Sequence, residues 1–197
     1  WKELARPVTP PGSFAMQLCD DLELFAIDGR PDVARAEIES IRAGVPEHIE
    51  DLMGLGATEV ALAVGDSATA RVELTRFETS IEKLNLGILE PQALRLRSRE
   101  RLAAGDPAGA LAAADAVLAL DPTARHVGRL RAEALDALGR PDDALEAVEF
   151  QLAADPSHPW ALLAKARILA SAGRVDEAIA TYETLLPLWK DADADYA

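Results

Sequence analysis

The chain has little of what would support a cross-linked, sheet-based or membrane-spanning protein. Cys19 is the single cysteine in 197 residues, which excludes an internal disulfide and a metal site built from cysteines. Aromatic residues make up only 5% of the sequence, and this disfavours a β-sandwich, which needs aromatic and β-branched positions. No run of 18 apolar residues is present, so we expect no membrane insertion.

Basic residues are also scarce. The chain has 20 Lys and Arg residues against 34 Asp and Glu residues, which gives a net charge of -14 at pH 7. The phosphate backbone of a nucleic acid repels so acidic a chain, and we expect no nucleic acid among its partners. The low cysteine content favours a reducing compartment such as the cytoplasm. The chain begins at Trp1 and not at a methionine, which favours a processed form or a fragment.

Signatures of catalysis are missing as well. The sequence contains no phosphate-binding loop, no nucleophile elbow and no metal-ligand spacing. His48, His126 and His158 lie far apart in the chain, where roles in helix caps or turns are expected. We therefore predict that the chain is not an enzyme and that it uses no cofactor or metal ion.

The strongest positive signal is a period of 34 residues, marked by Gly105, Gly139 and Gly173. An alanine follows each glycine after five residues and a leucine follows after thirteen, in two columns: Ala110, Ala144 and Ala178, and Leu118, Leu152 and Leu186. A fixed step of this size indicates a stacked array of repeats.

Each 34-residue unit is predicted to contain two helices joined at its glycine. Glycine adopts the left-handed conformation that ends a helix at little cost. Pro107 and Pro141 then fit the start of the second helix, where a backbone amide has no partner to lose. Pro122 and Pro156 close their units, because proline cannot continue a helix.

The same pattern occurs earlier in the chain with more drift. Gly29-Arg30-Pro31-Asp32 repeats Gly139-Arg140-Pro141-Asp142, and Gly65-Asp66 repeats Gly105-Asp106. The sequence therefore predicts the following organisation: an extended lead-in at 1–12, two irregular helix pairs at 13–86, a connecting loop at 87–91, three regular helix pairs at 92–189 and an acidic tail at 190–197.

These units resemble tetratricopeptide repeats. The resemblance rests on the turn glycines, the alanine column, the closing prolines and a small residue in each first helix: Ser98, Ala132 and Ala166. It implies an all-α fold, a right-handed α-α superhelix or solenoid of about five helix pairs. The large aromatic residues usual in the first helix of this family are replaced by Leu94, Gly128 and Leu162.

Stacked repeats bury their apolar stripes against their neighbours, so we expect the alanines to line the seam and the leucines to fill it. The last unit ends with Leu185, Leu186, Leu188 and Trp189, followed by only eight residues, which are too few for a covering helix of normal length. Either this tail folds back over the face, or another domain or a second copy covers it, as in a homo-oligomer formed through the C-terminal face. We read this as a sign that the chain is one module of a larger protein.

The resemblance also implies a concave groove lined by the first helices, where partner peptides bind. The residues 13, 10 and 6 positions before each turn glycine are implied to face it, and they supply our candidate partner-binding residues: Gln92, Arg95, Arg99, His126, Arg129, Trp160 and Arg167. In one interpretation the arginines clamp an acidic peptide or a C-terminal carboxylate. In the other they pair with neighbouring acids and only solvate the surface.

A second basic column lies eight residues before each glycine, at Arg97, Arg131 and Lys165. This column is either a second row of side chains that bind anions or a row of long side chains whose aliphatic stems cover apolar surface while their charged ends stay in water. The array of repeats predicts that the whole chain is a protein-protein interaction scaffold that binds a protein or peptide in its concave groove. The alternative is a regulatory or oligomerisation module of a larger multidomain bacterial protein, such as a kinase, cyclase or sulfotransferase.

Overall fold

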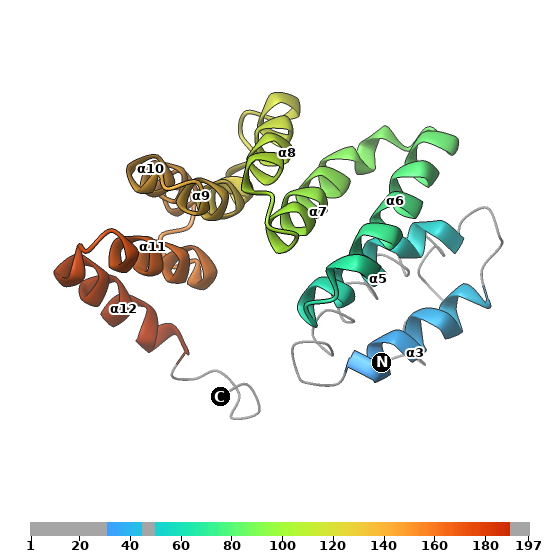
Figure 1. Cartoon of the computed structure of the whole chain (residues 1–197), viewed down its shortest axis with the longest axis horizontal. Coiled ribbons are helices and arrows are strands. Elements are labelled where there is room, and N and C mark those ends of the chain that lie inside the picture. The colour runs from blue at the N-terminus through green and yellow to red at the C-terminus, as the bar shows by residue number, and fades with distance from the viewer. Residues whose placement is uncertain (1–30, 45–49, 190–197) are drawn as a thin grey trace. The chain divides into compact units, whose positions relative to one another are not determined.

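The computed structural model describes residues 31–44 and 50–189, and in this part of the chain all regular structure is helical (Figure 1). The predicted lead-in at 1–12, the acidic tail at 190–197, Cys19 and His48 lie outside the described residues. The elements, with η marking 3-10 helices, are α3 (Pro31–Arg42), η1 (Asp51–Met53), α5 (Gly54–Ala63), α6 (Ser67–Lys83), η2 (Gly87–Leu89), α7 (Glu90–Ala103), α8 (Pro107–Leu120), η3 (Arg125–Val127), α9 (Gly128–Ala137), α10 (Pro141–Leu152), α11 (Pro159–Ser171) and α12 (Val175–Trp189).

The all-α prediction is confirmed, and four helix pairs are described in full: α5/α6, α7/α8, α9/α10 and α11/α12. Helix α3 occupies the second-helix position of the pair predicted to precede them. The count of five pairs and the right-handed sense of the superhelix stay predictions.

The turn within each pair has one geometry. Its glycine is left-handed in all four cases, with φ of 75°, 76°, 73° and 74° at Gly65, Gly105, Gly139 and Gly173. The amide of Gly139 donates to the carbonyl of Asp136 at 2.9 Å, and the next amide, of Arg140, donates to Leu135 at 3.0 Å. This pair of bonds is a Schellman motif, which satisfies the last carbonyls of the first helix. The predicted role of the turn glycines is confirmed.

The second helices begin in two ways. The side chains of Asp66 and Asp106 accept from the amides of Thr69 at 3.0 Å and Gly109 at 2.9 Å, so they cap α6 and α8. Helix α10 has no such cap, and Arg140 pairs instead with Asp143 at 2.6 Å. Pro107 and Pro141 are the first residues of α8 and α10, as predicted.

The segment predicted as a connecting loop at 87–91 links α6 to α7 and contains short helical structure. Residues 87–89 form η2, and α7 begins at Glu90. Pro91 therefore lies in the first turn of α7, where the amide that proline lacks would have no partner in the helix. The left-handed residue of this junction is Asn85, with φ of 53°, which ends α6 as the glycines end the first helices.

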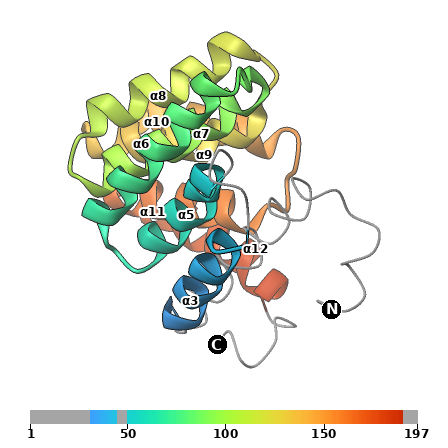
Figure 2. The same ribbon diagram turned by 90° about the vertical axis from the view of Figure 1, so that its right-hand side faces the viewer.

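The chain divides into two compact units, one ending at Leu96 and the other beginning at Arg97. In unit 1, α5 packs on α6 and on α3 (Figure 2). The core of this unit contains Met53, Leu74 and Phe77, together with Ala93 and Leu96 from the first half of α7. In unit 2, α9, α10, α11 and α12 lie side by side, and their core is built from alanine, leucine, valine and isoleucine (Figure 1).

The alanine column lies in the seam between helices, as predicted. Ala110 and Ala144 are 0% exposed and Ala178 is 3% exposed. Ala70, five residues after Gly65, is the equivalent position in an earlier repeat and is also 0% exposed. The leucine column is only partly buried. Leu152 is 6% exposed, but Leu186 is 61% exposed, so the prediction that Leu186 fills a seam is wrong. The neighbouring Leu185, at 1%, is the buried residue of that turn.

The glycines that replace a large first-helix residue let two helices approach closely. A Cβ atom at Gly128 would lie 2.5 Å from the carbonyl oxygen of Ala147 and 2.9 Å from the Cβ of Gln151, both in α10. Gly54 meets α6 in the same way, with Phe77 as its neighbour. The volume missing from the first helix is thus supplied by a larger residue of the second.

A buried ion pair joins α3 to α6 in unit 1. The guanidinium of Arg42 binds the carboxylate of Glu73, and the two side chains are 10% and 9% exposed. Burial acts to lower the pKa of Arg42, but the hydrogen bonds and charges of Glu73 and Glu39 together outweigh it, so the net direction is upward. The sequence pattern gave no indication of this pair, because the two residues are 31 positions apart.

Candidate partner-binding surface

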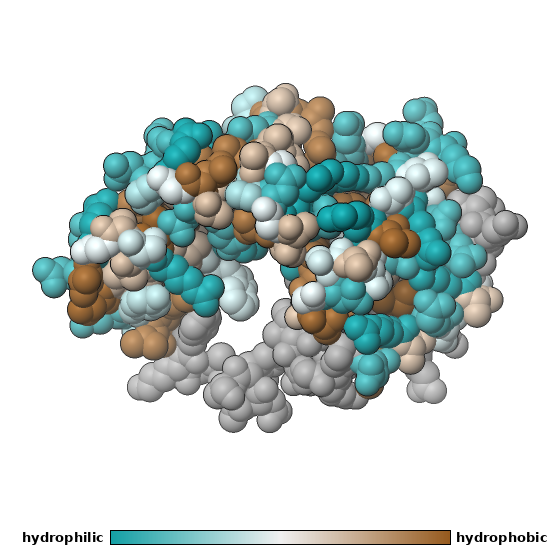
Figure 3. Space-filling view, viewed as in Figure 1, coloured by the Kyte–Doolittle hydropathy of each residue, from teal (hydrophilic) through white to brown (hydrophobic). Residues whose placement is uncertain are grey.

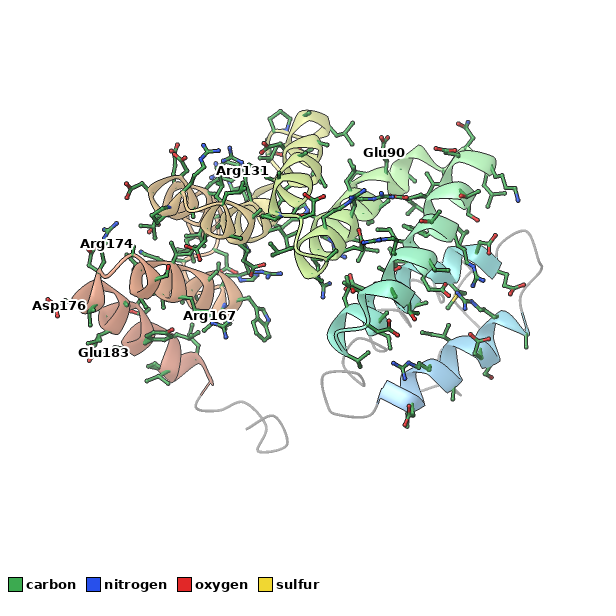
Figure 4. The ribbon with its side chains drawn as sticks, viewed as in Figure 1. Glu90, Arg131, Arg167, Arg174, Asp176 and Glu183 are labelled. Atoms are coloured by element: carbon green, nitrogen blue, oxygen red, sulfur yellow. The ribbon has the colours of Figure 1, made fainter. Side chains whose placement is uncertain are left out.

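In the last repeat, the three positions predicted to face the groove lie on one face of α11. Trp160, Leu163 and Arg167 are spaced by three and then four residues, which places them on the same side of a helix. Trp160 is 54% exposed, and Leu163 is half-buried against the core. Arg167 is exposed (Figure 4), and within the described residues no ion pair is recorded for it. This face offers an aromatic ring and a cation to solvent.

The corresponding face of α9 carries a partly neutralised cation. The guanidinium of Arg129 binds the carboxylate of Glu133, one helical turn later, at 2.6 Å. The two side chains are 29% and 33% exposed, so the pair lies at the surface. For Arg129 the alternative of pairing with a neighbouring acid is therefore the one observed. His126 lies exposed in η3, just before α9.

Helices α9 and α11 pack on each other, so their faces are neighbours within unit 2. We call this surface the α9–α11 face and define it by the following residues: His126, Arg129, Glu133, Trp160, Leu163 and Arg167. Arg99, in the last turns of α7, is half-buried and belongs to the same unit.

The other two candidates belong to unit 1. Arg95 binds Glu59 of α5 at 3.2 Å, and the Glu59 side chain is only 5% exposed. The Gln92 amide, oriented so that its nitrogen donates, binds the carbonyls of Ile88 and Leu89 at 3.2 Å each. Both candidates therefore make bonds within unit 1, Arg95 between two first helices and Gln92 across the start of α7.

The second basic column has a function that neither sequence interpretation anticipated. Arg131 of α9 binds Asp115 of α8 at 2.7 Å, and Lys165 of α11 binds Glu149 of α10 at 2.5 Å. Each bond joins a first helix to the second helix of the preceding repeat. The signal in the sequence is an acid 16 residues before Arg131 and before Lys165, whereas the residue 16 positions before Arg97, the third member of the column, is Ile81. At this degree of exposure such pairs add little to stability.

Two further charged groups stabilise helix starts. The hydrogen bond from Arg174 lowers the pKa of Glu177 in the first turn of α12, and the same bond raises the pKa of Arg174. The backbone amide of Thr69 is the main cause of the lowered pKa of Asp66 at the start of α6. His158 accepts from the amide of Ala161 at 3.2 Å through Nδ1, which confirms the predicted capping role for this histidine.

Two kinds of feature are absent from the described part of the chain. Its histidine, cysteine, aspartate and glutamate side chains form no group of three that could hold a metal ion. None of its helices combines the length and the apolar character needed to cross a bilayer.

The fold and the turn geometry together define a helical repeat protein. Sequence models described as tetratricopeptide repeat match residues 95–149 and 137–197, which together are just over half of the chain. The chain belongs to the tetratricopeptide repeat family, and its repeats make it a scaffold of the type that binds proteins or peptides. No curated protein matches the sequence.

Solved structures share this fold at low sequence identity. The TPR-like repeats of a proposed kinesin light chain of Podosopora anserina match with a TM-score of 0.60 and 18% identity, over 95% of this chain and 100% of that one. A crystal structure of MamA matches with a TM-score of 0.56 and 18% identity, over 81% of this chain and 88% of that one. These likenesses support the helical repeat fold.

Proposed function

We propose that the chain binds a partner polypeptide in the concave groove of its repeats, and that the α9–α11 face forms the part of the groove within unit 2. The observation that carries this proposal is that two exposed residues, Trp160 and Arg167, lie on the same side of α11. Trp160 is 54% exposed. Large aromatic residues and arginine are the residue types that contribute most to binding at protein interfaces.

The chemistry of this face favours an acidic segment or a free C-terminal carboxylate. A guanidinium binds a carboxylate through two parallel hydrogen bonds, and Arg167 has no recorded ion pair among the described residues that would compete. Arg129 is the weaker candidate, because an incoming carboxylate must displace Glu133. The ring of Trp160 would cover an apolar stem or ring of the same partner.

The proposal assigns the chain a binding role and no catalytic one. A second candidate, an oligomerisation or regulatory module of a larger multidomain protein, is favoured by the exposed apolar residues of α12, where Ile179 is 51% and Leu186 is 61% exposed. Self-association through this C-terminal face stays a prediction.

The proposal is tested with a fluorescein-labelled nonapeptide of Glu, Asp and Leu that ends in a free carboxylate. Fluorescence anisotropy should show binding to the full chain that weakens as salt rises, because ionic contacts at a surface are screened. Arg167→Glu should weaken binding by about tenfold, the value of one charge-assisted hydrogen-bonded contact.

Arg174→Glu is the matched control, because Arg174 is a partly exposed arginine that directly precedes α12 and lies outside the α9–α11 face. It should leave the peptide affinity unchanged. Equal losses in the two variants, or no loss in either, would contradict the clamp while leaving the repeat fold untouched. Circular dichroism of both variants checks that their helices are retained.

A further inference from the structure

The outer side of α12 repeats a surface that is covered elsewhere in unit 2. At steps of 34 residues, the three second helices carry an apolar residue, an acid four positions later and a leucine three positions after that. This spacing puts the three residues on one stripe of a helix. The stripes are Leu111, Asp115 and Leu118 in α8, Leu145, Glu149 and Leu152 in α10, and Ile179, Glu183 and Leu186 in α12.

In α8 and α10 the first helix of the next repeat covers the stripe. Helix α9 packs on α8, and α11 packs on α10. The acid of each stripe binds a base of the incoming helix, in the Arg131–Asp115 and Lys165–Glu149 pairs. Leu152, only 6% exposed, lies in one core cluster with residues of α11.

In α12 the same stripe lies at the surface. Ile179 is 51% exposed and Leu186 is 61% exposed, and Val175, at 58%, extends the apolar part by one turn. Glu183 is exposed as well and points away from α11 (Figure 4). The space-filling view shows apolar side chains at the surface over α12 (Figure 3). Leu186 and Leu152 occupy equivalent positions in their repeats. Leu186 is more exposed because, among the described residues, no helix packs on the α12 stripe as α11 packs on α10.

We infer that the α12 stripe binds an amphipathic α-helix of a partner polypeptide, which presents a lysine or arginine to Glu183. The two helices that cover the equivalent stripes, α9 and α11, indicate which residues such a partner helix should carry. Both have a base, an alanine directly after it and a leucine three residues later: Arg131, Ala132 and Leu135 in α9, and Lys165, Ala166 and Leu169 in α11. Both alanines are 0% exposed, so a small residue at this position allows close approach.

The negative charge of Glu183 favours a basic partner helix over two other possible occupants of the stripe, a second copy of the chain and the residues that follow α12. A second copy that pairs its α12 with this α12 would bring the same acid to both sides of a symmetric interface, where like charges oppose binding. Residues 190–197 of the chain carry three aspartates after Lys190, so their net charge also opposes contact with Glu183. A basic helix alone continues the pattern of the two interfaces already formed.

The α12 stripe is distinct from the α9–α11 face. If the α12 stripe binds no helix, the proposed function of the α9–α11 face is therefore unaffected. The test uses the full chain and a hydrocarbon-stapled, fluorescein-labelled peptide with the sequence of residues 158–173, which contains Lys165. The staple is needed because a free helix of this length is marginal in water. A second peptide carries Lys165→Glu and is otherwise identical.

We expect the Lys165 peptide to bind the wild-type chain and the Lys165→Glu peptide to bind about fivefold more weakly, as one surface ion pair is replaced by a repulsion. Glu183→Lys in the chain should reverse this preference, so that the Lys165→Glu peptide binds better. Leu186→Asp should weaken the Lys165 peptide by about tenfold or more, because a buried leucine is lost. Arg167→Glu, on the other face, should change neither affinity.

Four results would overturn the inference: no binding of either peptide, equal affinities of the two peptides for the wild-type chain, binding that survives Leu186→Asp, and a dimer of the full chain that Leu186→Asp dissociates in sedimentation experiments. The last would make a second copy the occupant. Both substituted residues are exposed, so the variants should fold, and thermal melts followed by circular dichroism check this. If Leu186→Asp unfolds the chain, Leu186→Ser takes its place.

Discussion

At the scale of single residues, backbone conformation decides what each turn accepts. All four turn glycines have φ between 73° and 76°, a region that costs other L-residues about 1–2 kcal/mol. A Cβ atom at these glycines would meet no other atom within 4 Å, so space is not the constraint. Asn85, with φ of 53°, shows which other residue type tolerates the position.

Gly139→Ala should therefore destabilise unit 2 by about 1 kcal/mol, through backbone strain alone. Gly87→Ala is the matched control, because Gly87 is equally open to a Cβ atom and is not left-handed. Chemical denaturation of the two variants measures the difference in the free energy of unfolding. A loss of the same size in both would show that the left-handed conformation is not its cause.

The turn glycines and the small seam residues could be predicted from the sequence, because each depends only on its own position in the repeat. The Arg131–Asp115 and Lys165–Glu149 bonds could not, since the residues are 16 positions apart and belong to different repeats. Their partners follow only from knowing which sides of two helices meet. The Arg95–Glu59 bond likewise joins two different repeats. The Arg129–Glu133 bond differs, because its residues are four positions apart in one helix and pairing with a neighbouring acid was one interpretation of the sequence.

At the scale of helices, a glycine in the first helix lets the second helix approach its backbone closely. Where the first helix has a glycine, the facing residue of the second helix is large: Phe77 opposite Gly54 and Gln151 opposite Gly128. Where the first helix has Leu162, the second has Leu185, 1% exposed and in the same core cluster. The sequence showed that aromatic residues were missing from the first helices, but not that the second helices fill their space.

Gly128→Ala should destabilise the chain by about 1–3 kcal/mol, because its Cβ would overlap the backbone of α10. The φ of Gly128 is -54°, so the substitution adds no backbone strain and isolates the effect of packing. Thermal unfolding followed by calorimetry measures the loss. A variant as stable as the wild type would show that α9 and α10 do not approach as closely as described.

At the scale of the whole molecule, one repeated seam carries both the fold and the binding surfaces. Stability in such an array comes from the interfaces between neighbouring repeats, because one helix pair cannot bury its own apolar stripe. The same stacking brings the first helices α9 and α11 next to each other and leaves the α12 stripe without a cover among the described residues. The chain has a net charge of -14, so the two proposed surfaces differ in chemistry: the α9–α11 face presents the cation Arg167 and the α12 stripe presents the acid Glu183.

The central claim is that closely stacked repeats, held by a seam of small residues, form the scaffold, and Ala144→Leu tests it most directly. Ala144 is 0% exposed in the cluster that joins α9, α10 and α11. Overpacking should lower the free energy of unfolding by about 1–3 kcal/mol. Ala112→Leu, at an exposed position of α8, should have little effect. Thermal unfolding that gives the same stability for Ala144→Leu and the wild type would contradict the claim.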